Sequence, residues 1–360
     1  MLLYDSFLEL DMLEFGIGIP MNASRTANIL RALEERGAKL RARSLCEVAA
    51  LIGAEWPVMG RADFERVHEH NYISRFYNDP PGSLEKILLA TYELIGEDGS
   101  YNRYDPLKAV RPLSDLFAVL IHRVSGSYLA ARVALARKGE IGGAAYDGFC
   151  FYLGGGTHHA RYDCGSGFCA LNDLIIAVRK LQHEGRAGLV WIVDVDAHKG
   201  DGSAELTQFS RARGETFCGK APEIITLSVH MARGWPLDEQ SLAQAEPGRA
   251  PLVESDIDIP IEVGEEGLYC LRLAEGLKKL EDLSGGRKPD LVLVEDGADV
   301  YEKDGLESTA LIRLSLEQCL QRDRLILSFF KECAIPTAWL MAGGYGKDAW
   351  EPTAAFLSSL

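Results

Sequence analysis

Six short apolar runs lie between residue 148 and the end of the chain, and segments with a helical pattern separate them. The runs are GFCFYL at 148–153, LVWIVDV at 189–195, EIITLSV at 223–229, IDIPI at 257–261, LVLVE at 291–295 and TAWLMA at 337–342. The helical candidates between them include 171–185 and 267–280. Continuous apolar strands that alternate with helices are typical of a parallel sheet covered on both faces. We therefore predict a three-layer α/β fold, in which a mainly parallel β-sheet is flanked by helices on both faces.

The first part of the chain has a weaker pattern. Residues 24–44 predict a pair of amphipathic helices broken at Gly37, with Ser24 as the cap of the first helix. Residues 81–147 are mostly helical in pattern. The length of 360 residues is compatible with two domains, but an α/β fold of this size is often one. No repeat or long linker is visible, so we expect residues 1–360 to form a single domain.

Acidic residues and a histidine follow two of the predicted strands and form a candidate metal site. Asp196 and His198 lie two residues apart after LVWIV, so the alternation of a strand points both to the same side as Asp194. Asp299 follows a second apolar run, LVLVE. Ligands of parallel sheets bind beyond the carboxyl ends of the strands. One histidine and two aspartates are the ligand count of a catalytic zinc site, which leaves a position for water and substrate.

A histidine pair follows three glycines in GGGTHHA at 154–160. Next to a metal-bound water, His158 or His159 can act as general base and then as general acid. Each imidazole needs a carboxylate to orient it and to raise its basicity, and Asp194 and Asp201 flank the predicted ligands. The alternative is a chance pair in a glycine loop, which the polar clusters at the other strand ends make less plausible.

Two more strand ends carry polar residues. Tyr345, in MAGGYG after the last apolar run, can stabilise the oxyanion of a tetrahedral intermediate, although a tyrosine packed on a glycine turn is the simpler interpretation of the residue type alone. Ser228, in TLSVHM, offers a hydroxyl that suits a hard monovalent cation or closes a turn. The remaining histidines have no partner in a shared motif and are interpreted as structural or surface residues: His68, His70, His122, His183 and His230.

Composition excludes some partners. The formal net charge of -15 argues against broad nucleic-acid binding, which needs a basic footprint. No apolar stretch approaches the roughly 20 residues of a membrane span, and the acidic start MLLYDSFLELDM lacks the basic region of a signal peptide. The eight cysteines form no CxxC pair, so free thiols in a reducing cytoplasm are expected. The sequence thus predicts a cytoplasmic protein with neither a nucleic-acid nor a membrane partner.

Four motifs, in this order, resemble the histone deacetylase superfamily, whose members have the arginase/deacetylase fold. The motifs are GGGTHHARYDCGSGFCALND at 154–173, DVDAHKGDG at 194–202, GADVYEKDG at 297–305 and GGYG at 343–346. The resemblance covers roughly residues 120–350, and IPMNASRTANILRAL at 19–33 is similar to the family's first helix. It implies zinc-dependent hydrolysis of an N-acyl amide.

The resemblance also implies a role for individual residues. The zinc ligands would be Asp196, His198 and Asp299, with Fe²⁺ as the alternative metal. The catalytic residues would be the tandem histidines His158 and His159, their carboxylate partners Asp194 and Asp201, and the carbonyl-polarising Tyr345. The substrate channel would be walled by Gly167, Phe168 and Trp235. An inner, structural K⁺ would be held by Asp194, Asp196, His198, Ser228 and Val229.

The chain departs from the family pattern at three places. Lys199 replaces the histidine that usually follows the ligand histidine, and because that residue is not a ligand the metal site should survive. Asn22 or Arg25 stands near the position where many members have an arginine that lines an inner cavity. Glu295 and Asp296 stand where the family often has small or apolar residues, and the sequence indicates no role for them.

The implied reaction is hydrolysis of an N-acetyl or longer N-acyl amine, in which His159 takes a proton from the attacking water and Tyr345 stabilises the oxyanion. Acyl-lysine peptides, acetylpolyamines and small acylated metabolites all remain open as substrates. The alternative is a catalytically silent acyl-group-binding protein, which would be expected to lack the tyrosine or a tandem histidine. A dimanganese ureohydrolase is disfavoured, because Gly200 and Gly297 stand where a second metal would need carboxylates.

Substrate choice is expected to depend on the rim of the channel. The loops at 92–106 and 230–250 are predicted to shape that rim. Glu97 and Asp98 can contact a peptide backbone or a cationic amine there, although solvated loop charges are the simpler interpretation. The sequence predicts no oligomeric state.

Overall fold

The computed structural model describes residues 1–21, 23–38, 40–96, 98–136, 141, 148–216, 223–238, 241 and 252–360. One eight-stranded sheet runs through it in the order β2-β1-β3-β8-β7-β4-β5-β6. The strands are β1 (Leu2–Tyr4), β2 (Ala42–Ser44), β3 (Phe149–Tyr152), β4 (Leu189–Asp194), β5 (Glu223–Met231), β6 (Ile257–Ile261), β7 (Leu291–Asp296) and β8 (Thr337–Met341). Each of these neighbouring pairs is parallel, so the predicted α/β fold and its six predicted strands are confirmed.

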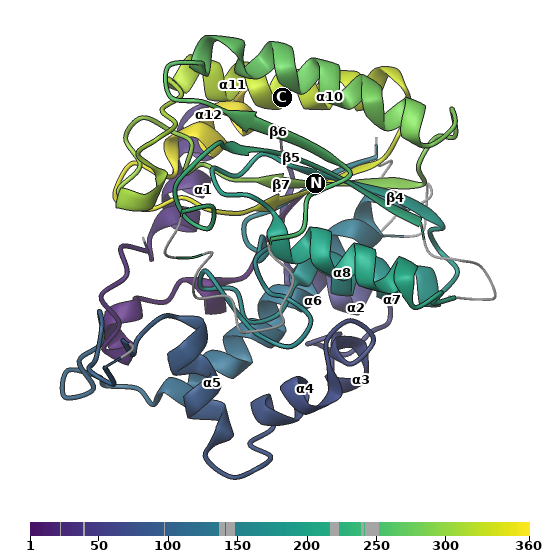
Figure 1. Cartoon of the computed structure of the whole chain (residues 1–360). Coiled ribbons are helices and arrows are strands. Elements are labelled where there is room, and N and C mark those ends of the chain that lie inside the picture. Colours follow the sequence, from purple (N-terminus) through teal and green to yellow (C-terminus); the bar gives the residue numbers. More distant parts are fainter. Residues whose placement is uncertain are drawn as a thin grey trace.

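Helices cover both faces of the sheet (Figure 1). One face, called the α11 face here, carries α1 (Arg25–Glu35), α10 (Tyr269–Leu283), α11 (Leu316–Glu332) and α12 (Glu351–Ser358). The opposite face, called the α6 face, carries α2 (Leu45–Leu51), α6 (Leu116–Ala134), α7 (Asp173–His183) and α8 (Asp201–Ala212). Three further helices lie beneath that layer: α3 (Arg61–Phe64), α4 (His70–Phe76) and α5 (Ser83–Thr91).

Successive residues of the central strands are buried in different cores, as the twofold alternation of a strand requires. In β4, Ile192 belongs to the core of the α6 face and Val193 to that of the α11 face. In β7, Leu293 belongs to the core of the α6 face and Val294 to that of the α11 face. The alternation continues to the end of β7, so Glu295 points to the α6 face and Asp296 to the α11 face.

The first third of the chain differs from the prediction. Helix α1 ends before Gly37, which has a positive φ of 66°, but the segment that follows is strand β2 and not a second helix. It pairs with β1, a strand that the sequence did not reveal. The side chain of Ser24 makes no capping hydrogen bond to α1. Strands of three residues are too short for hydrophobic periodicity to identify them.

Candidate metal and catalytic site

The candidate metal ligands follow the carboxyl ends of β4 and β7, two neighbouring central strands. In the register of these strands, Asp194 lies opposite Glu295. The chain continues past β4 to Asp196 and His198, and past β7 to Asp299. All three candidate ligands are buried. Parallel neighbours bring their carboxyl ends together, which explains why residues about a hundred positions apart meet here.

The three side chains converge on one point. His198 Nδ1 lies 3.2 Å from Asp196 Oδ1 and 3.2 Å from Asp299 Oδ2. One ligand atom from each residue lies within 4.8 Å of the other two. Asp299 Oδ2 is buried, yet it has no hydrogen-bond partner among the described residues. The three atoms are one imidazole nitrogen and two carboxylate oxygens, and one of these oxygens lacks a hydrogen-bond partner. This set fits a divalent cation with nitrogen and oxygen ligands.

Glycines allow the backbone to approach the two aspartates closely. A Cβ atom on Gly297 would lie 2.6 Å from Asp196 Oδ2 and 2.8 Å from Asp299 Oδ1. A Cβ on Gly343 would lie 2.4 Å and 2.5 Å from Oδ2 of the same two residues. Instead, the Gly343 N–H donates to Asp196 Oδ2 at 3.0 Å, and the Ala197 N–H donates to Asp299 Oδ1 at 2.9 Å. Backbone N–H groups therefore hold both carboxylates, and the glycines leave the space that this close approach requires.

The tandem histidines each have one carboxylate partner, as the sequence predicted. His158 Nδ1 lies 2.6 Å from Asp194 Oδ2, and His159 Nδ1 lies 2.8 Å from Asp201 Oδ1. The two imidazole rings are 3.9 Å apart between centroids, and both are buried. His158 Nε2 lies 3.7 Å from Asp196 Oδ1, so the histidine pair borders the candidate metal position.

Asp173, at the start of α7, anchors the loop that carries the histidines. Its carboxylate accepts hydrogen bonds from the N–H groups of Gly156 and Thr157 at 2.9 and 2.7 Å, and from the hydroxyls of Thr157 and Ser127 at 2.6 and 2.5 Å. The side chain of Asn172 donates to the carbonyl of His158 at 3.2 Å. Both residues lie in the first motif, but the sequence alone indicated no role for either.

The two histidines have opposite electrostatic surroundings. Burial acts to lower the pKa of His158, but the carboxylates of Asp194 and Asp196 outweigh it and raise that pKa well above its usual range. Burial, together with the neighbouring charge of His158, lowers the pKa of His159 to about 4, against the opposing effect of Asp201. At neutral pH, the side chain of His158 is therefore the charged imidazolium, whereas that of His159 is the neutral imidazole with one free acceptor nitrogen.

A cavity of about 260 Å³ opens onto these groups. It is lined by the predicted catalytic and ligand residues His158, His159, Asp196, His198 and Tyr345, and by the predicted channel residues Gly167, Phe168 and Trp235. The Trp235 ring lies edge-on to His159 with 4.6 Å between centroids, and a Cβ on Gly167 would lie 2.3 Å from Trp235 Cη2. Gly167 has a positive φ of 52°, so both space and backbone conformation favour glycine at this wall.

Tyr345 is positioned by a residue of the third motif. Its backbone N–H donates to Asp304 Oδ2 at 2.7 Å, and its ring lies 6.4 Å from that of Phe168. Burial and the nearby carboxylates of Asp299 and Asp196 raise the pKa of the Tyr345 phenol well above its usual range. The phenol therefore stays protonated and can donate a hydrogen bond into the cavity. The sequence alone gave no indication of this role for Asp304.

Both loops that were predicted to shape the rim contribute to the cavity: Glu93 and Arg103 come from 92–106, and Trp235 from 230–250. Glu307 and Ser308 also line it, which the sequence did not predict. Asp98 does not line the cavity, and its carboxylate accepts hydrogen bonds from the N–H and hydroxyl of Ser100 at 2.9 and 2.6 Å. Glu97 and most of the 230–250 loop (239, 240 and 242–250) lie outside the described residues.

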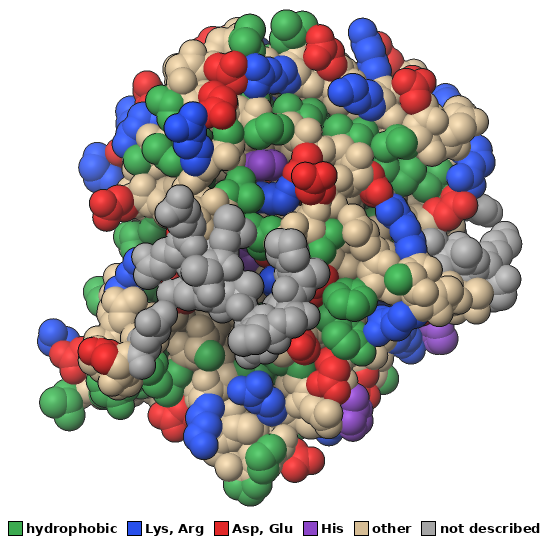
Figure 2. Space-filling view, viewed as in Figure 1, with side chains coloured by type: hydrophobic (Ala, Val, Ile, Leu, Met, Phe, Trp, Pro, Cys, Tyr) green, Lys and Arg blue, Asp and Glu red, His purple; other side chains and the backbone are tan. Residues whose placement is uncertain are grey.

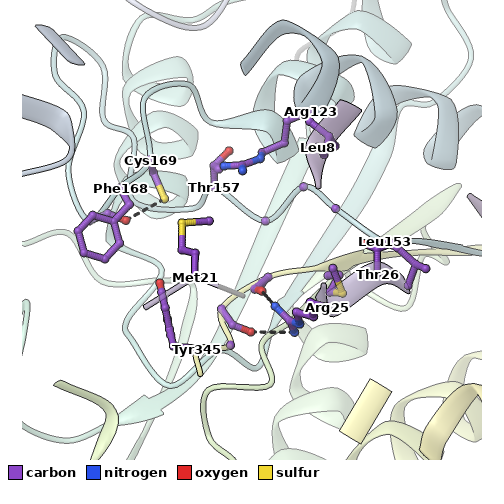
Figure 3. Close-up of a pocket in the computed structure, with 18 of the residues that line it drawn as sticks. Leu8, Met21, Arg25, Thr26, Arg123, Leu153, Thr157, Phe168, Cys169 and Tyr345 are labelled. Carbon is purple, nitrogen blue, oxygen red and sulfur yellow. Dashed lines mark hydrogen bonds between the residues drawn. The ribbon is translucent and has the colours of Figure 1, made fainter. Parts of the chain in front are cut away.

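A second cavity of about 130 Å³ adjoins the first and shares Tyr345 and Phe168 with it; Figure 3 shows residues that line this second cavity. Arg25 lines it and donates to the carbonyls of Ala342 and Gly343 at 2.7 and 3.1 Å. The sequence left Asn22 and Arg25 open as the residue near the arginine position of the family. Arg25 lines this second cavity, whereas Asn22 lies outside the described residues.

Two of the departures from the family pattern lie next to the site. Lys199 is buried and forms an ion pair with Asp258, so it points away from the candidate ligands. Glu295 is fully buried, and neither of its carboxylate oxygens has a hydrogen-bond partner among the described residues. Its Oε1 lies 3.9 Å from His158 Nδ1, and burial raises its pKa well above the usual range. Asp296, on the opposite face, pairs with Arg322.

The residues predicted for the inner cation site lie on neighbouring strands. Asp194 of β4 is the register partner of Ser228 of β5, and Val229 follows directly. The Gly200 N–H donates to the Ser228 hydroxyl at 3.3 Å. The sequence did not reveal one contact of a candidate ligand: the hydroxyl of Ser308, in a 3-10 helix over Glu307–Thr309, lies 3.2 Å from His198 Nε2. A lone serine gives no sequence signal for such a contact.

Comparison with known proteins identifies the family. The histone deacetylase domain matches residues 19–358, so the chain belongs to the histone deacetylase domain family. It is 34% identical over 62% of its length to an uncharacterized protein of Picosynechococcus, 27% over 63% to Histone deacetylase 2 of Arabidopsis thaliana, and 25% over 79% to the acetoin utilization protein AcuC of Staphylococcus aureus. The matches span 62%, 49% and 63% of those relatives, respectively.

The fold agrees with that assignment. The crystal structure of an acetylpolyamine aminohydrolase from Burkholderia pseudomallei resembles this chain with a TM-score of 0.62 and 16% sequence identity, over 99% of this chain and 97% of that one. The chain therefore has the arginase/deacetylase fold that the motifs predicted. None of the helices in the described part of the chain has the length and apolar character needed to span a bilayer. Acidic and basic side chains are interspersed over the face drawn in Figure 2.

Proposed function

We propose that this chain is a metal-dependent deacylase that hydrolyses the amide of an N-acyl amine, with an N-acetyl group as the simplest substrate. One observation carries the proposal: two members of a convergent Asp–His–Asp triad (Asp196 and His198), the imidazoles of two histidine–carboxylate pairs and a tyrosine line the same cavity. Membership of the histone deacetylase family supports the same reaction class. A silent acyl-binding protein would have no need for both His–Asp pairs and Tyr345.

Asp196, His198 and Asp299 would hold the metal, for which we propose Zn²⁺ with Fe²⁺ as the alternative. When bound, such a metal acts as a Lewis acid and lowers the pKa of a coordinated water from 15.7 to about 7. His198 would ligate through Nδ1, the atom that faces both aspartates, and its Nε2 faces Ser308.

Proton transfer falls to His159. Its Nδ1 is engaged by Asp201, so the free Nε2 accepts the proton of the attacking water and later returns it to the leaving amine. His158, which holds its proton beside Asp194, acts as a fixed positive charge next to the developing tetrahedral centre. The Tyr345 phenol donates a hydrogen bond to the oxyanion as it forms. A structural K⁺ at Asp194, Asp196, His198, Ser228 and Val229 completes the proposal.

The test is a measurement of kcat/KM on acetyl-lysine peptides, longer acyl-lysine peptides and acetylpolyamines. We expect turnover of at least one class, loss of turnover after chelation, and recovery with Zn²⁺ or Fe²⁺. Replacing K⁺ with a large organic cation in the same assays tests the inner site. Binding of acylated amines with no turnover under any metal condition would show instead that the chain is a silent acyl-group binder.

A further inference from the structure

A buried ion-pair network lies on the α11 face, directly behind the candidate metal ligands. Its centre is Arg322 of α11, whose side chain is 1% exposed. The guanidinium donates from Nη2 to Asp296 Oδ1 at 2.5 Å and from Nε to Asp323 Oδ1 at 2.7 Å. This network gives a partner to Asp296, the acidic residue for which the sequence indicated no role.

The same guanidinium also binds the backbone of both ligand-bearing segments. Arg322 Nη1 donates to the carbonyl of Val195 at 3.0 Å and to the carbonyl of Gly297 at 2.7 Å. Val195 directly precedes the candidate ligand Asp196, and Gly297 lies two residues before Asp299. One side chain from a helix therefore connects the two segments at the point where each turns toward the metal position.

The sheet no longer makes this connection itself. The regular pairing of β4 with β7 ends at Asp194 and Glu295, and the Val195 N–H still donates to the Glu295 carbonyl at 3.0 Å. Beyond it, the carbonyls of Val195 and Gly297 both turn to Arg322. The spacing between the segments has little tolerance, because a Cβ on Gly297 would already lie 2.6 Å from the Cα of Asp196.

Stability alone is a weak explanation for this network. Buried ion pairs are often no more stabilising than well-packed apolar residues of similar volume, since the charges lose their hydration. Here two carboxylates share one guanidinium, and Asp323 Oδ2 has no hydrogen-bond partner among the described residues. A planar guanidinium does, however, present several donors in a rigid fork, which suits the task of holding separate acceptors at fixed distances.

We propose that Arg322 is a positioning residue, which sets the distance between Asp196 and Asp299 by holding the carbonyls of Val195 and Gly297 from behind the sheet. The inference rests on the proposed function, because it assumes that these aspartates bind a metal. The spacing of the metal ligands would then depend on a side chain that contacts neither metal nor substrate. Groups that orient metal ligands typically change metal affinity by 10–100-fold when they are altered.

The test uses Co²⁺, whose visible spectrum reports ligand geometry, titrated into the full-length chain after chelation of resident metal. The variant Arg322→Lys keeps a positive charge for Asp296 and Asp323 but loses the fork. The matched control is Arg179→Lys in α7, another buried arginine, which donates to Gln182 of its own helix at 2.7 Å. Thermal unfolding of the metal-free proteins measures the general loss of stability in both variants.

We expect Arg322→Lys to bind Co²⁺ about 10–100-fold more weakly with an altered spectrum, while Arg179→Lys keeps the wild-type affinity and spectrum. Wild-type affinity and spectrum in Arg322→Lys, or an equal loss of affinity in the control, would overturn the inference. If Arg322→Lys does not fold, the triple variant Arg322→Met with Asp296→Asn and Asp323→Asn removes the guanidinium and both of its carboxylate partners together and faces the same criteria. Failure of the wild-type chain to bind Co²⁺ would instead refute the metal site on which the proposed function depends.

Discussion

The site has two halves built from the same two residue types. In the proton-handling half (His158, His159, Asp194 and Asp201), each imidazole faces one carboxylate oxygen at 2.6–2.8 Å. In the metal-holding half (Asp196, His198 and Asp299), one imidazole nitrogen lies 3.2 Å from an oxygen of each of two carboxylates. Short one-to-one pairs are hydrogen bonds that hold a tautomer in place. A nitrogen shared at longer distance between two acids leaves room for a cation among the three atoms.

The difference also appears in the origin of the residues. The ligands lie just past the ends of adjacent central strands, where Arg322 binds the carbonyls of both segments beyond the last register pair. The histidine pair comes from a glycine-rich loop, which the side chain of Asp173 fixes through four hydrogen bonds. The metal position thus depends on two neighbouring strand ends and one arginine behind them, whereas the proton-transfer groups depend on side-chain contacts that hold an irregular loop. Variants in the two halves should therefore fail in different ways.

The largest effect is expected in the metal-holding half. The substitution Asp299→Ala removes one of three ligands and the unsatisfied buried oxygen, so we expect loss of nearly all bound metal and of all measurable turnover. Elemental analysis of the purified protein checks this, with Asp201→Asn as a control that should retain metal. Full metal occupancy in Asp299→Ala would refute its role as a ligand.

The next effect belongs to the proton-handling half. The substitution His159→Gln removes the only neutral imidazole of the tandem pair, so kcat should fall by about 10²–10⁴-fold while metal content stays at the wild-type level. Paired kinetic and elemental measurements on the same preparation separate the two. If metal content fell together with kcat, the distinction between the halves would be wrong.

Tyr345 belongs to neither half and should respond like an oxyanion donor. The substitution Tyr345→Phe keeps the ring that packs near Phe168 but removes the hydroxyl, so we expect kcat to fall about 10²–10³-fold with metal content and KM little changed. Steady-state kinetics on the best substrate of the panel give both parameters. Unchanged turnover would assign the tyrosine to packing alone.

The sequence was informative wherever a pattern is repeated over several residues. Strands β3, β4, β5, β7 and β8 are mostly apolar runs because both of their faces are largely buried, whereas the edge strand β6 alternates between buried and more exposed residues. The metal ligands could be placed from their positions after β4 and β7. Strands β1 and β2 could not be recognised, because three residues are too few to show a period. The second predicted helix was in fact β2, since polar residues with good helical propensity can also be recruited by an edge strand.

Residues that act by supporting others were missed for a different reason. Asp173, Asp304 and Ser308 each hold a functional group through a contact with a residue distant in sequence, and a single sequence carries no trace of such contacts. Asp296 was noticed only as a departure from the family pattern. Its partner, Arg322, lies in an amphipathic helix where arginine is unremarkable, so only the packing of α11 against the sheet reveals it.

Another buried histidine, His68, lies behind the proton-handling half and offers a test by pH. His68 Nε2 accepts from the Asn172 N–H at 3.0 Å, and its Nδ1 donates to the Arg161 carbonyl at 2.7 Å. Burial lowers the pKa of His68 to about 4, whereas an unfolded histidine titrates near 6.5. As the pH falls from 6.5 to 4, the unfolded chain binds a proton at His68 that the folded chain does not bind. The free energy of unfolding should therefore decrease over this range, by up to about 3 kcal/mol from this residue.

The variant His68→Gln isolates that contribution, because an amide can still donate and accept a hydrogen bond but does not titrate. Urea unfolding at pH 7 and at pH 5 gives the pH dependence of stability for each protein. We expect the wild-type chain to lose more stability than the variant between these two values. Parallel losses would show that His68 does not stay neutral in the folded state.

The smallest effect is expected at Ser308, which lies at the cavity mouth and contacts the metal-holding half from outside. Its hydroxyl lies 3.2 Å from His198 Nε2 and can fix the ring so that Nδ1 faces the two aspartates. The substitution Ser308→Ala should weaken Co²⁺ binding by about tenfold, the lower end for groups that orient a ligand, because water can replace a hydroxyl at a partly exposed position. Ser308→Thr retains the hydroxyl and should bind Co²⁺ like the wild-type chain. If both variants bound Co²⁺ like the wild-type chain, the contacts with the two aspartates would be enough to orient His198, and the Ser308 hydroxyl would have no part in it.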